Sequence, residues 1–210
     1  MTPRLPDGEA APVDGVLPEA VLARLRVPKA FDGSDRFGAY VHVPYCATRC
    51  GYCDFNTYTP GELAGAPALT GFGQSDEVDS YLTALCAEIE LAAQTIRGRT
   101  DAPLPTIDTL FIGGGTPTLL ATEHLATILD RLDKVFGLSP RVEISTEANP
   151  ESVTQESLAE LVDAGFTRIS LGMQSAVGHV LSVLDRQHTP GRAVLAAQQA
   201  RKAGFSNVNL

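Results

Sequence analysis

The chain has 210 residues, enough for one domain with a sizeable core, and its 44% hydrophobic and 20% charged residues are typical of a globular protein. A net charge of -9 argues against binding of duplex nucleic acid, which requires a basic surface. No apolar run approaches the roughly 18 residues that span a bilayer, and the first residues lack the apolar core of a signal peptide. We therefore expect a cytoplasmic protein without a transmembrane segment.

The N-terminal segment differs in composition from the rest of the chain. Residues 1–36 are rich in Pro, Ala, Gly and acidic residues, which predicts a flexible extension. A short helix is expected within it at residues 18–27. The folded domain is expected to occupy residues 37–210 and to begin with a buried strand at residues 39–43, closed by Pro44.

Strands and helices then alternate along the chain. A Gly- and Pro-rich surface loop is expected at residues 59–76, before an amphipathic helix in which apolar residues recur every three or four positions from Val78 to Ile96. Further strands are expected at residues 106–113, 141–148, 167–173 and 205–210. Further helices are expected at residues 119–135, 154–164, 176–184 and 191–203.

This alternation predicts an α/β fold with parallel strands and right-handed crossovers. Composition alone leaves open a β/α barrel and an open doubly wound sheet. A strand at the very end of the chain would be an unprotected sheet edge, so we expect the chain to be a fragment of a longer protein.

Three of the four cysteines, Cys46, Cys50 and Cys53, form a C-x3-C-x2-C motif. An odd cluster cannot pair off as disulfides, and clustered thiols in a reducing compartment favour metal binding. Three thiolates suit a 4Fe-4S cluster with one iron left open to another ligand. The alternative is a zinc site, which normally has four protein ligands, and His42 would have to turn toward the metal. Cys86 is predicted to be a small buried residue in a helix.

Polar or Gly-rich motifs follow four of the expected strands. The Cys motif follows the first strand and GGGTPT, residues 113–118, follows the second. Glu147 and Asn149 come at the end of the third strand, and Gln174 and Ser175 at the end of the fourth. Because ligands bind at the carboxyl ends of parallel strands, these motifs are expected to converge on one site.

Each motif has a binding role and a plainer structural alternative. The glycines of GGGTPT allow backbone approach to a ligand or a tight turn, and without a following Lys they are not a P-loop. Glu147 would hold a ribose hydroxyl or an ammonium group, or be a surface carboxylate. Gln174 would bind a ligand or a neighbouring loop. Arg186 would pair with a ligand carboxylate or remain solvated.

At these residues the sequence resembles the radical SAM superfamily, whose signature is this Cys motif with an aromatic residue, here Tyr52, before the last cysteine. The segments YVHVPYCATRCGYCDFN, GGGTPTLL, STEANPES, RISLGMQS and VLDRQH resemble the subgroup of oxygen-independent coproporphyrinogen III oxidase over residues 38–210. The resemblance implies a partial (β/α)6 barrel, of which this chain would carry the first four to five units. It also implies reductive cleavage of S-adenosylmethionine to methionine and a deoxyadenosyl radical.

The resemblance also implies roles for individual residues. Cys46, Cys50 and Cys53 would bind the 4Fe-4S cluster. A further acidic ligand is expected beyond residue 210. The residues that would line the sites for S-adenosylmethionine are Tyr40, Tyr52, Gly114, Gly115, Thr116, Glu147, Gln174 and Arg186.

One departure separates this chain from the oxidases that it resembles. Those enzymes carry a fourth cysteine two residues after the triad, where this chain has Phe55. This form resembles the heme chaperone branch, whose members bind heme, transfer it to partners such as respiratory enzymes and lack oxidase activity. Our leading hypothesis is thus a cytoplasmic heme chaperone that binds a 4Fe-4S cluster, S-adenosylmethionine and heme.

The heme site of such a chaperone is expected beyond residue 210, and its partner is expected to be a heme-accepting protein, reached by peripheral contact where that recipient is membrane-bound. Three alternatives remain open. One is an oxidase of porphyrin biosynthesis that decarboxylates coproporphyrinogen III to protoporphyrinogen IX. Another is a related radical SAM enzyme such as a methyltransferase. The last is a zinc-binding structural module.

Overall fold

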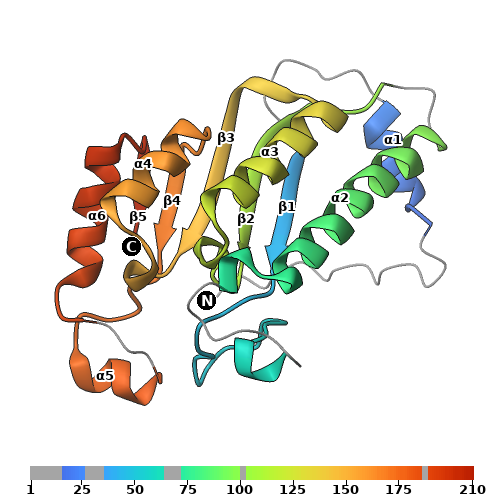
Figure 1. The fold of residues 1–210 in the computed structure, drawn as a ribbon. Helices are drawn as coiled ribbons and strands as arrows, with labels where there is room; N and C mark the ends of the chain where they lie inside the picture. The colour runs from blue at the N-terminus through green and yellow to red at the C-terminus, as the bar shows by residue number, and fades with distance from the viewer. Residues whose placement is uncertain (1–15, 27–35, 64–71, 100–102, 186–188) are drawn as a thin grey trace, which may run out of the picture.

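A single parallel sheet organises the chain (Figure 1). The computed structural model describes residues 16–26, 36–63, 72–99, 103–185 and 189–210. Within these residues the sheet has five strands in the order β1-β2-β3-β4-β5, and each neighbouring pair is parallel. The strands are β1 (Gly38–Val43), β2 (Ile107–Gly114), β3 (Leu138–Ala148), β4 (Arg168–Leu171) and β5 (Asn207–Asn209).

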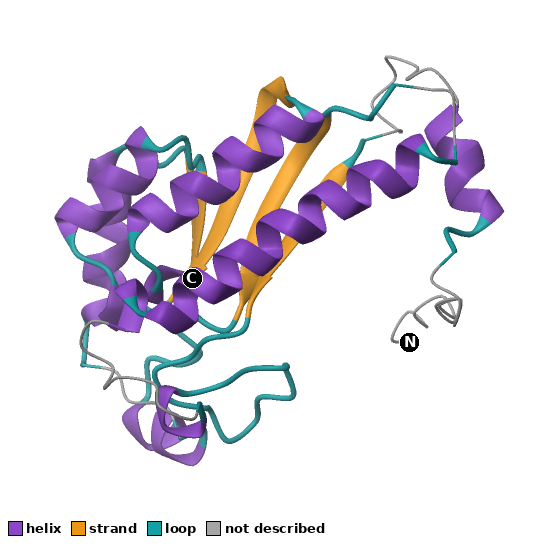
Figure 2. Ribbon diagram, turned by 45° about the vertical axis from the view of Figure 1, so that its right-hand side comes forward, coloured by secondary structure: helices purple, strands orange, loops and turns teal. Residues whose placement is uncertain are grey.

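Helices connect the strands. Those of the described residues are α1 (Glu19–Arg26), α2 (Asp76–Arg97), α3 (Thr122–Phe136), α4 (Gln155–Asp163), α5 (Gly178–Val183) and α6 (Arg192–Ala203). Helices α2, α3, α4 and α6 lie side by side on one face of the sheet (Figure 2), where α2 packs on α3, α3 on α4 and α4 on α6. In a doubly wound sheet the strand order reverses and helices cover both faces. The sequential order and the one-sided helices are those of a β/α barrel, so the structure confirms the barrel-type α/β fold and excludes the doubly wound alternative.

The two faces of the sheet differ in chemistry because successive strand residues point to opposite sides. The face under the helices carries the apolar core of the strands. The other face carries Tyr40, His42 and Phe111, and of these Tyr40 is 59% exposed. The buried residues on the helix side are Val41, Val43, Leu110, Ile112, Ile144, Ile169 and Leu171.

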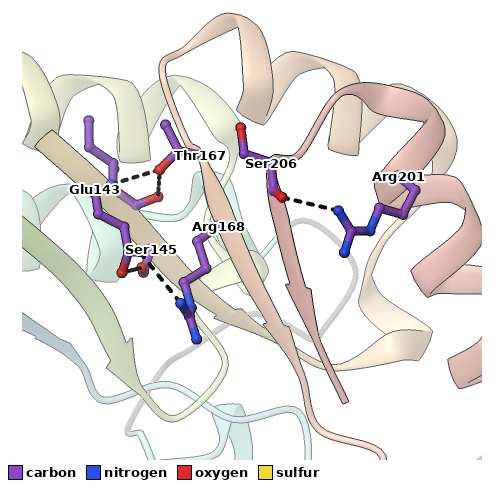
Figure 3. A network of polar contacts seen from close by, with 7 residues as sticks. Glu143, Ser145, Thr167, Arg168, Arg201 and Ser206 are labelled. Atoms are coloured by element: carbon purple, nitrogen blue, oxygen red, sulfur yellow. Dashed lines mark hydrogen bonds and ion pairs between the residues drawn. The ribbon is translucent and has the colours of Figure 1, made fainter. Parts of the chain in front are cut away.

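Polar contacts on β3, β4 and the start of β5 support their alignment (Figure 3). Arg168 of β4 lies 3.5 Å from the carboxylate of Glu143 on β3. The hydroxyl of Ser145 donates to the same carboxylate at 3.3 Å. Arg201 of α6 donates to the backbone oxygen of Ser206 at 3.0 Å, which ties the helix to the residue before β5.

The expected elements are found, with shifted ends. The helix expected at residues 119–135 begins at Thr122, because Pro117–Leu119 form a 3-10 turn first. The third strand begins at Leu138, three residues before its expected start. The segment 59–76 is not wholly a surface loop, since Phe72 is 1% exposed and packs edge-on against Tyr45.

The short helix predicted within the N-terminal segment is present. The expected short helix is α1, and its Leu22 is buried. Residues 1–15 and 27–35 lie outside the described residues, so the flexible extension stays a prediction, as does the domain boundary at residue 37. The prediction for Cys86 was wrong in degree, because this residue of α2 is only half-buried.

Candidate cofactor site

A cavity of about 510 Å³ lies at the carboxyl ends of the strands. The Cys loop, defined as residues 46–53, follows β1 there. The glycine turn, defined as residues 113–116, lies at the end of β2. The cavity thus brings together motifs from four strands, as their positions in the sequence predicted. The predicted residues that line it are Cys46, Cys50, Tyr52, Cys53, Gly114, Gly115, Thr116, Glu147 and Gln174.

Backbone pairing fixes the two ends of the segment that contains the Cys loop. The Tyr58 amide donates to the Pro44 oxygen at 2.6 Å, and the Cys46 amide donates to the Tyr58 oxygen at 3.0 Å. This short parallel bridge closes the loop at its base. The guanidinium of Arg49 donates to the backbone oxygen of Thr57, which holds the chain on the same side.

Cys46 has the most enclosed thiol of the triad. It is 9% exposed, whereas Cys50 and Cys53 are half-buried. Burial raises the pKa of the Cys46 thiol, and the hydroxyls of Thr116 and Thr57 act in the opposite direction. The Thr57 hydroxyl is itself buried and has no hydrogen-bond partner of good geometry within the described residues.

The Cys loop offers the donor set that a four-iron cluster requires. Across the described ranges, no three Cys, His, Asp or Glu side chains converge closely enough to hold one metal ion. A four-iron cluster makes a different demand, because each thiolate binds its own iron and the sulfurs stay apart. The buried Thr57 hydroxyl beside Cys46 is a donor suited to a thiolate or sulfide, and the donor set of three thiols on one loop suits the same cluster.

The glycine turn brings backbone against the Cys loop. A Cβ at Gly115 would lie 2.3 Å from the Tyr45 oxygen and 3.0 Å from the Cys46 sulfur, so a larger residue does not fit. Gly114 has φ +112°, a conformation that L side chains rarely adopt, and its Cβ would meet the His42 ring at 2.7 Å. The backbone of this turn therefore lies close to Cys46, a predicted ligand of the cluster.

Glu147 is held over this turn. One of its carboxylate oxygens accepts a hydrogen bond from the Gly114 amide at 3.0 Å. That bond orients a carboxylate from the end of β3 on the wall of the cavity. A carboxylate fixed by a backbone donor suits a ligand that carries hydroxyl or ammonium groups.

Gln174 reaches the cavity through an unusual backbone conformation. Its φ is +60°, in the left-handed region that residues other than Gly, Asn and Asp seldom occupy. The turn is fixed by the Gly172 amide on the Ala148 oxygen at 3.0 Å and the Ser175 amide on the Met173 oxygen at 2.7 Å. Such strain often accompanies binding sites, and here it places an amide side chain on the cavity wall.

Of the described residues predicted to bind S-adenosylmethionine, Tyr40 is not among those that line the cavity. Tyr40 lies on the helix-free face of β1, where its hydroxyl is hydrogen-bonded to His42 at 2.9 Å and its ring stacks on Phe111 with centroids 5.9 Å apart. Burial and the charge of Glu147 raise the pKa of Tyr40, so the carboxylate is within electrostatic reach. Arg186 lies outside the described residues.

The Cys loop also contacts the end of α5. The Gly51 amide donates to the Leu184 oxygen at 3.3 Å. A Cβ at Gly51 would lie 2.5 Å from a carboxylate oxygen of Asp185, whose φ is +50°. The residue immediately before Arg186 therefore packs against the loop that carries the cysteines.

Reasoning from the sequence missed part of the cavity wall. Ser170, Met173 and Leu210 line it together with Phe55. Ser170 and Leu210 belong to or follow strand ends, so the rule that placed the other motifs was also the signal for these two.

Among the described residues, no helix is long and apolar enough to cross a membrane.

A family model described as the radical SAM superfamily matches residues 40–210 of the chain. This range contains the Cys triad, the glycine turn and every strand after the first residues of β1. The chain belongs to the radical SAM superfamily. Its sheet, with the cavity at the carboxyl ends of the strands, is thus a partial radical SAM barrel.

The relatives of this radical SAM chain share one description. It is 53% identical over 174 residues to the heme chaperone HemW of Mycobacterium tuberculosis, covering 83% of this chain and 40% of that protein. It is 37% identical over 174 residues to HemW of Bacillus subtilis, covering 82% of this chain and 41% of the relative. Within the superfamily, the chain is thus similar to proteins described as heme chaperones.

A solved radical SAM structure is also similar. The coproporphyrinogen III oxidase HemN of Escherichia coli superposes with a TM-score of 0.68 at 27% identity, over 91% of this chain and 39% of that chain. The present chain spans about two fifths of the length of the relatives it matches.

Proposed function

We propose that this chain is the cluster- and S-adenosylmethionine-binding part of a heme chaperone. The observation that carries the proposal is Phe55 on the cavity wall, where the oxidases that the sequence resembles carry a fourth cysteine. The remaining cysteine, Cys86, lies in α2 and is not among the residues that line the cavity. The similarity to HemW proteins supports the same assignment.

In this proposal the chain's own residues divide the binding work. Cys46, Cys50 and Cys53 hold a 4Fe-4S cluster and leave one iron without a protein ligand. A cluster held there would supply the electron for reductive chemistry on S-adenosylmethionine. Glu147 and Gln174, on the same wall as the glycine turn, orient the ligand by hydrogen bonds.

Heme and its recipient belong to the whole protein. The heme site lies in the part of the protein beyond residue 210, and the recipient is a heme-accepting protein reached in the cytoplasm or by peripheral contact with a membrane-bound partner. The reduced cysteines of the Cys loop suit such a reducing compartment. Tyr40, Tyr52 and Arg186 complete the proposed S-adenosylmethionine sites.

The second candidate is an oxygen-independent coproporphyrinogen III oxidase. The similarity of the fold to HemN favours it, because the two chains share the barrel at the site. Phe55, which stands where those oxidases carry a fourth cysteine, argues against it.

The deciding experiment uses the full-length protein, reconstituted anaerobically with iron and sulfide and then reduced. Deoxyadenosine is measured with S-adenosylmethionine, in the presence and absence of coproporphyrinogen III, and heme transfer to an apo-acceptor is measured in parallel. We expect about four irons per chain, no decarboxylated porphyrinogen and transfer of heme. Porphyrinogen-dependent deoxyadenosine with decarboxylated product would establish the oxidase instead.

The Cys50→Ala variant is the control for the cluster. Loss of one of three thiolates should abolish stable cluster assembly, as shown by iron and acid-labile sulfide content. Cys86→Ala is the matched variant outside the cavity and should keep the full iron content. Zinc without sulfide in the unmodified protein would contradict the cluster.

A further inference from the structure

Thr57 is a buried polar residue that the proposed function does not use. Its side chain is almost fully enclosed, with 2% of the residue exposed, and its hydroxyl has no hydrogen-bond partner of good geometry among the described residues. An unsatisfied buried hydroxyl costs about 1–3 kcal/mol, so native proteins retain few of them without a reason.

The backbone prevents this hydroxyl from turning to solvent. The neighbouring Tyr58 is bonded to Pro44 through its amide and to Cys46 through its oxygen. The backbone oxygen of Thr57 itself accepts from the guanidinium of Arg49. Thr57 is thus fixed beside Cys46 from both sides.

The Cys46 thiol is the group with which this hydroxyl interacts, since the Cys46 amide is bonded to the neighbouring Tyr58 and the hydroxyl lowers the pKa of the thiol. The hydroxyls of Thr116 and Thr57 both lower the pKa of this thiol, and Gly115 lies against its sulfur. A thiol is a weak acceptor, whereas a thiolate bound to a cluster is negatively charged and accepts strongly. The hydroxyl therefore gains its full partner when the cysteine is metallated.

We propose that the Thr57 hydroxyl donates to the Cys46 sulfur of the cluster and raises the cluster's reduction potential. Hydrogen bonds to the sulfurs are one of the levers that set this potential. The bond is stronger when the cluster has gained an electron, so it stabilises the reduced state more than the oxidised state. The proposal rests on the proposed cluster and adds to it one residue that tunes the electron transfer.

The test is Thr57→Val in the full-length protein, because valine keeps the shape and removes only the hydroxyl. The cluster's midpoint potential is measured by redox titration followed by electron paramagnetic resonance, without S-adenosylmethionine. We expect a shift to more negative potential, equivalent to about a three- to tenfold loss in the equilibrium constant for reduction, where tenfold is about 59 mV for one electron. Thr57→Ser should restore the wild-type potential.

Stability of the cluster-free protein gives a second readout. Because the hydroxyl lacks a partner there, Thr57→Val should unfold at the same denaturant concentration as wild type or a higher one. Thr118→Val is the matched control, since its hydroxyl is paired with Ser152 at 2.7 Å and Thr118 is not among the residues that line the cavity. It should leave the potential unchanged.

The outcomes separate this inference from the proposed function. A wild-type protein without iron and sulfide would overturn the cluster itself. A fully loaded Thr57→Val protein with the wild-type potential would overturn the role of Thr57 alone. If Thr57→Val loads poorly, Thr57→Ser decides: full loading at the wild-type potential supports the hydroxyl, and equally poor loading contradicts it.

Discussion

Gly115 has the tightest surroundings of the glycines near the Cys loop, because its Cα faces the Tyr45 backbone oxygen and the Cys46 sulfur. In Gly115→Ala the new Cβ would lie 2.3 Å from that oxygen, so the backbone must shift by a distance that also moves Cys46. We expect at least a severalfold loss of iron per chain. Gly61→Ala is the control, since nothing lies within 4 Å of its Cβ. Equal iron contents in the two variants would contradict the close approach.

Glu147 supports a prediction about the ligand. Glu147→Ala should weaken S-adenosylmethionine binding at least about tenfold, because bonds to a charged group are worth about 1.5–3 kcal/mol, and should leave the iron content unchanged. Glu147→Gln keeps an oxygen for the Gly114 amide and removes the charge. Titration calorimetry on the reconstituted protein measures both. Unchanged affinity in both variants would make Glu147 a structural residue.

For individual residues, the sequence predicted which side chains share the cavity better than it predicted their backbone conformations. The Cys motif and the strand-end position of Glu147 were sufficient to group them in one cavity. The positive φ of Gln174 and the packing of Asp185 on Gly51 could not be predicted, because both depend on turns closed by distant backbone atoms. The position of Tyr40 off the cavity wall follows from strand register, which the motif alone does not contain.

At the scale of elements, α4 shows how local sequence starts a helix. Thr154 accepts from the Ser157 amide at 3.2 Å and Ser157 bonds back to Thr154, which forms a capping box. Thr154→Ala should lower the free energy of unfolding by about 1 kcal/mol, measured by urea denaturation of the cluster-free protein.

The start of α2 supplies the contrast. Its N-cap Ser75 makes no capping hydrogen bond and its buried hydroxyl is unsatisfied in the described structure. Ser75→Ala should therefore change stability by much less than Thr154→Ala. A loss as large as that of Thr154→Ala would show that Ser75 has a partner after all.

Element ends were predicted less well than element types. Apolar periodicity located α2, but it cannot tell where β3 begins. Leu138 extends the strand by pairing with Ile107 of β2, and the register is irregular between this pair and the next one, Thr109 with Glu143. Helix α3 begins at Thr122 because the 3-10 turn at Pro117–Leu119 precedes it, and apolar periodicity does not predict that turn.

At the scale of the whole molecule, the order of the strands decided what composition left open. A run of parallel strands in sequential order puts its crossover helices on one face, and the opposite face then becomes the interior of a barrel. The exposed Tyr40 and Phe111 lie on that interior face. Family resemblance predicted this architecture, whereas alternation of elements alone did not.

The free energy of unfolding should decrease at alkaline pH, and ionisation of Tyr45 should contribute to that decrease. Burial, and then the charge of Glu77, raises the pKa of Tyr45 to about 12. An unfolded tyrosine ionises near pH 10, so between about pH 10 and pH 12 the unfolded state loses a proton that the folded state keeps, and stability falls as pH rises.

Tyr45→Phe removes this contribution. The decline in the free energy of unfolding between about pH 10 and pH 12 should become shallower in the variant, and Tyr81, whose pKa is also raised by burial, should maintain part of the slope. Urea denaturation at a series of pH values provides the measurement. Identical slopes for wild type and variant would show that Tyr45 ionises normally.

The contact between Gly51 and Leu184 makes two distant stretches of chain thermodynamically interdependent. Any molecule that binds better when the Cys loop is docked on the end of α5 must favour that docking, and the effect is reciprocal. A small molecule that favours this docking would then strengthen iron binding by the Cys loop, and iron would strengthen binding of the small molecule by the same factor. Solvent exchange of the Gly51 amide would report this coupling from either direction.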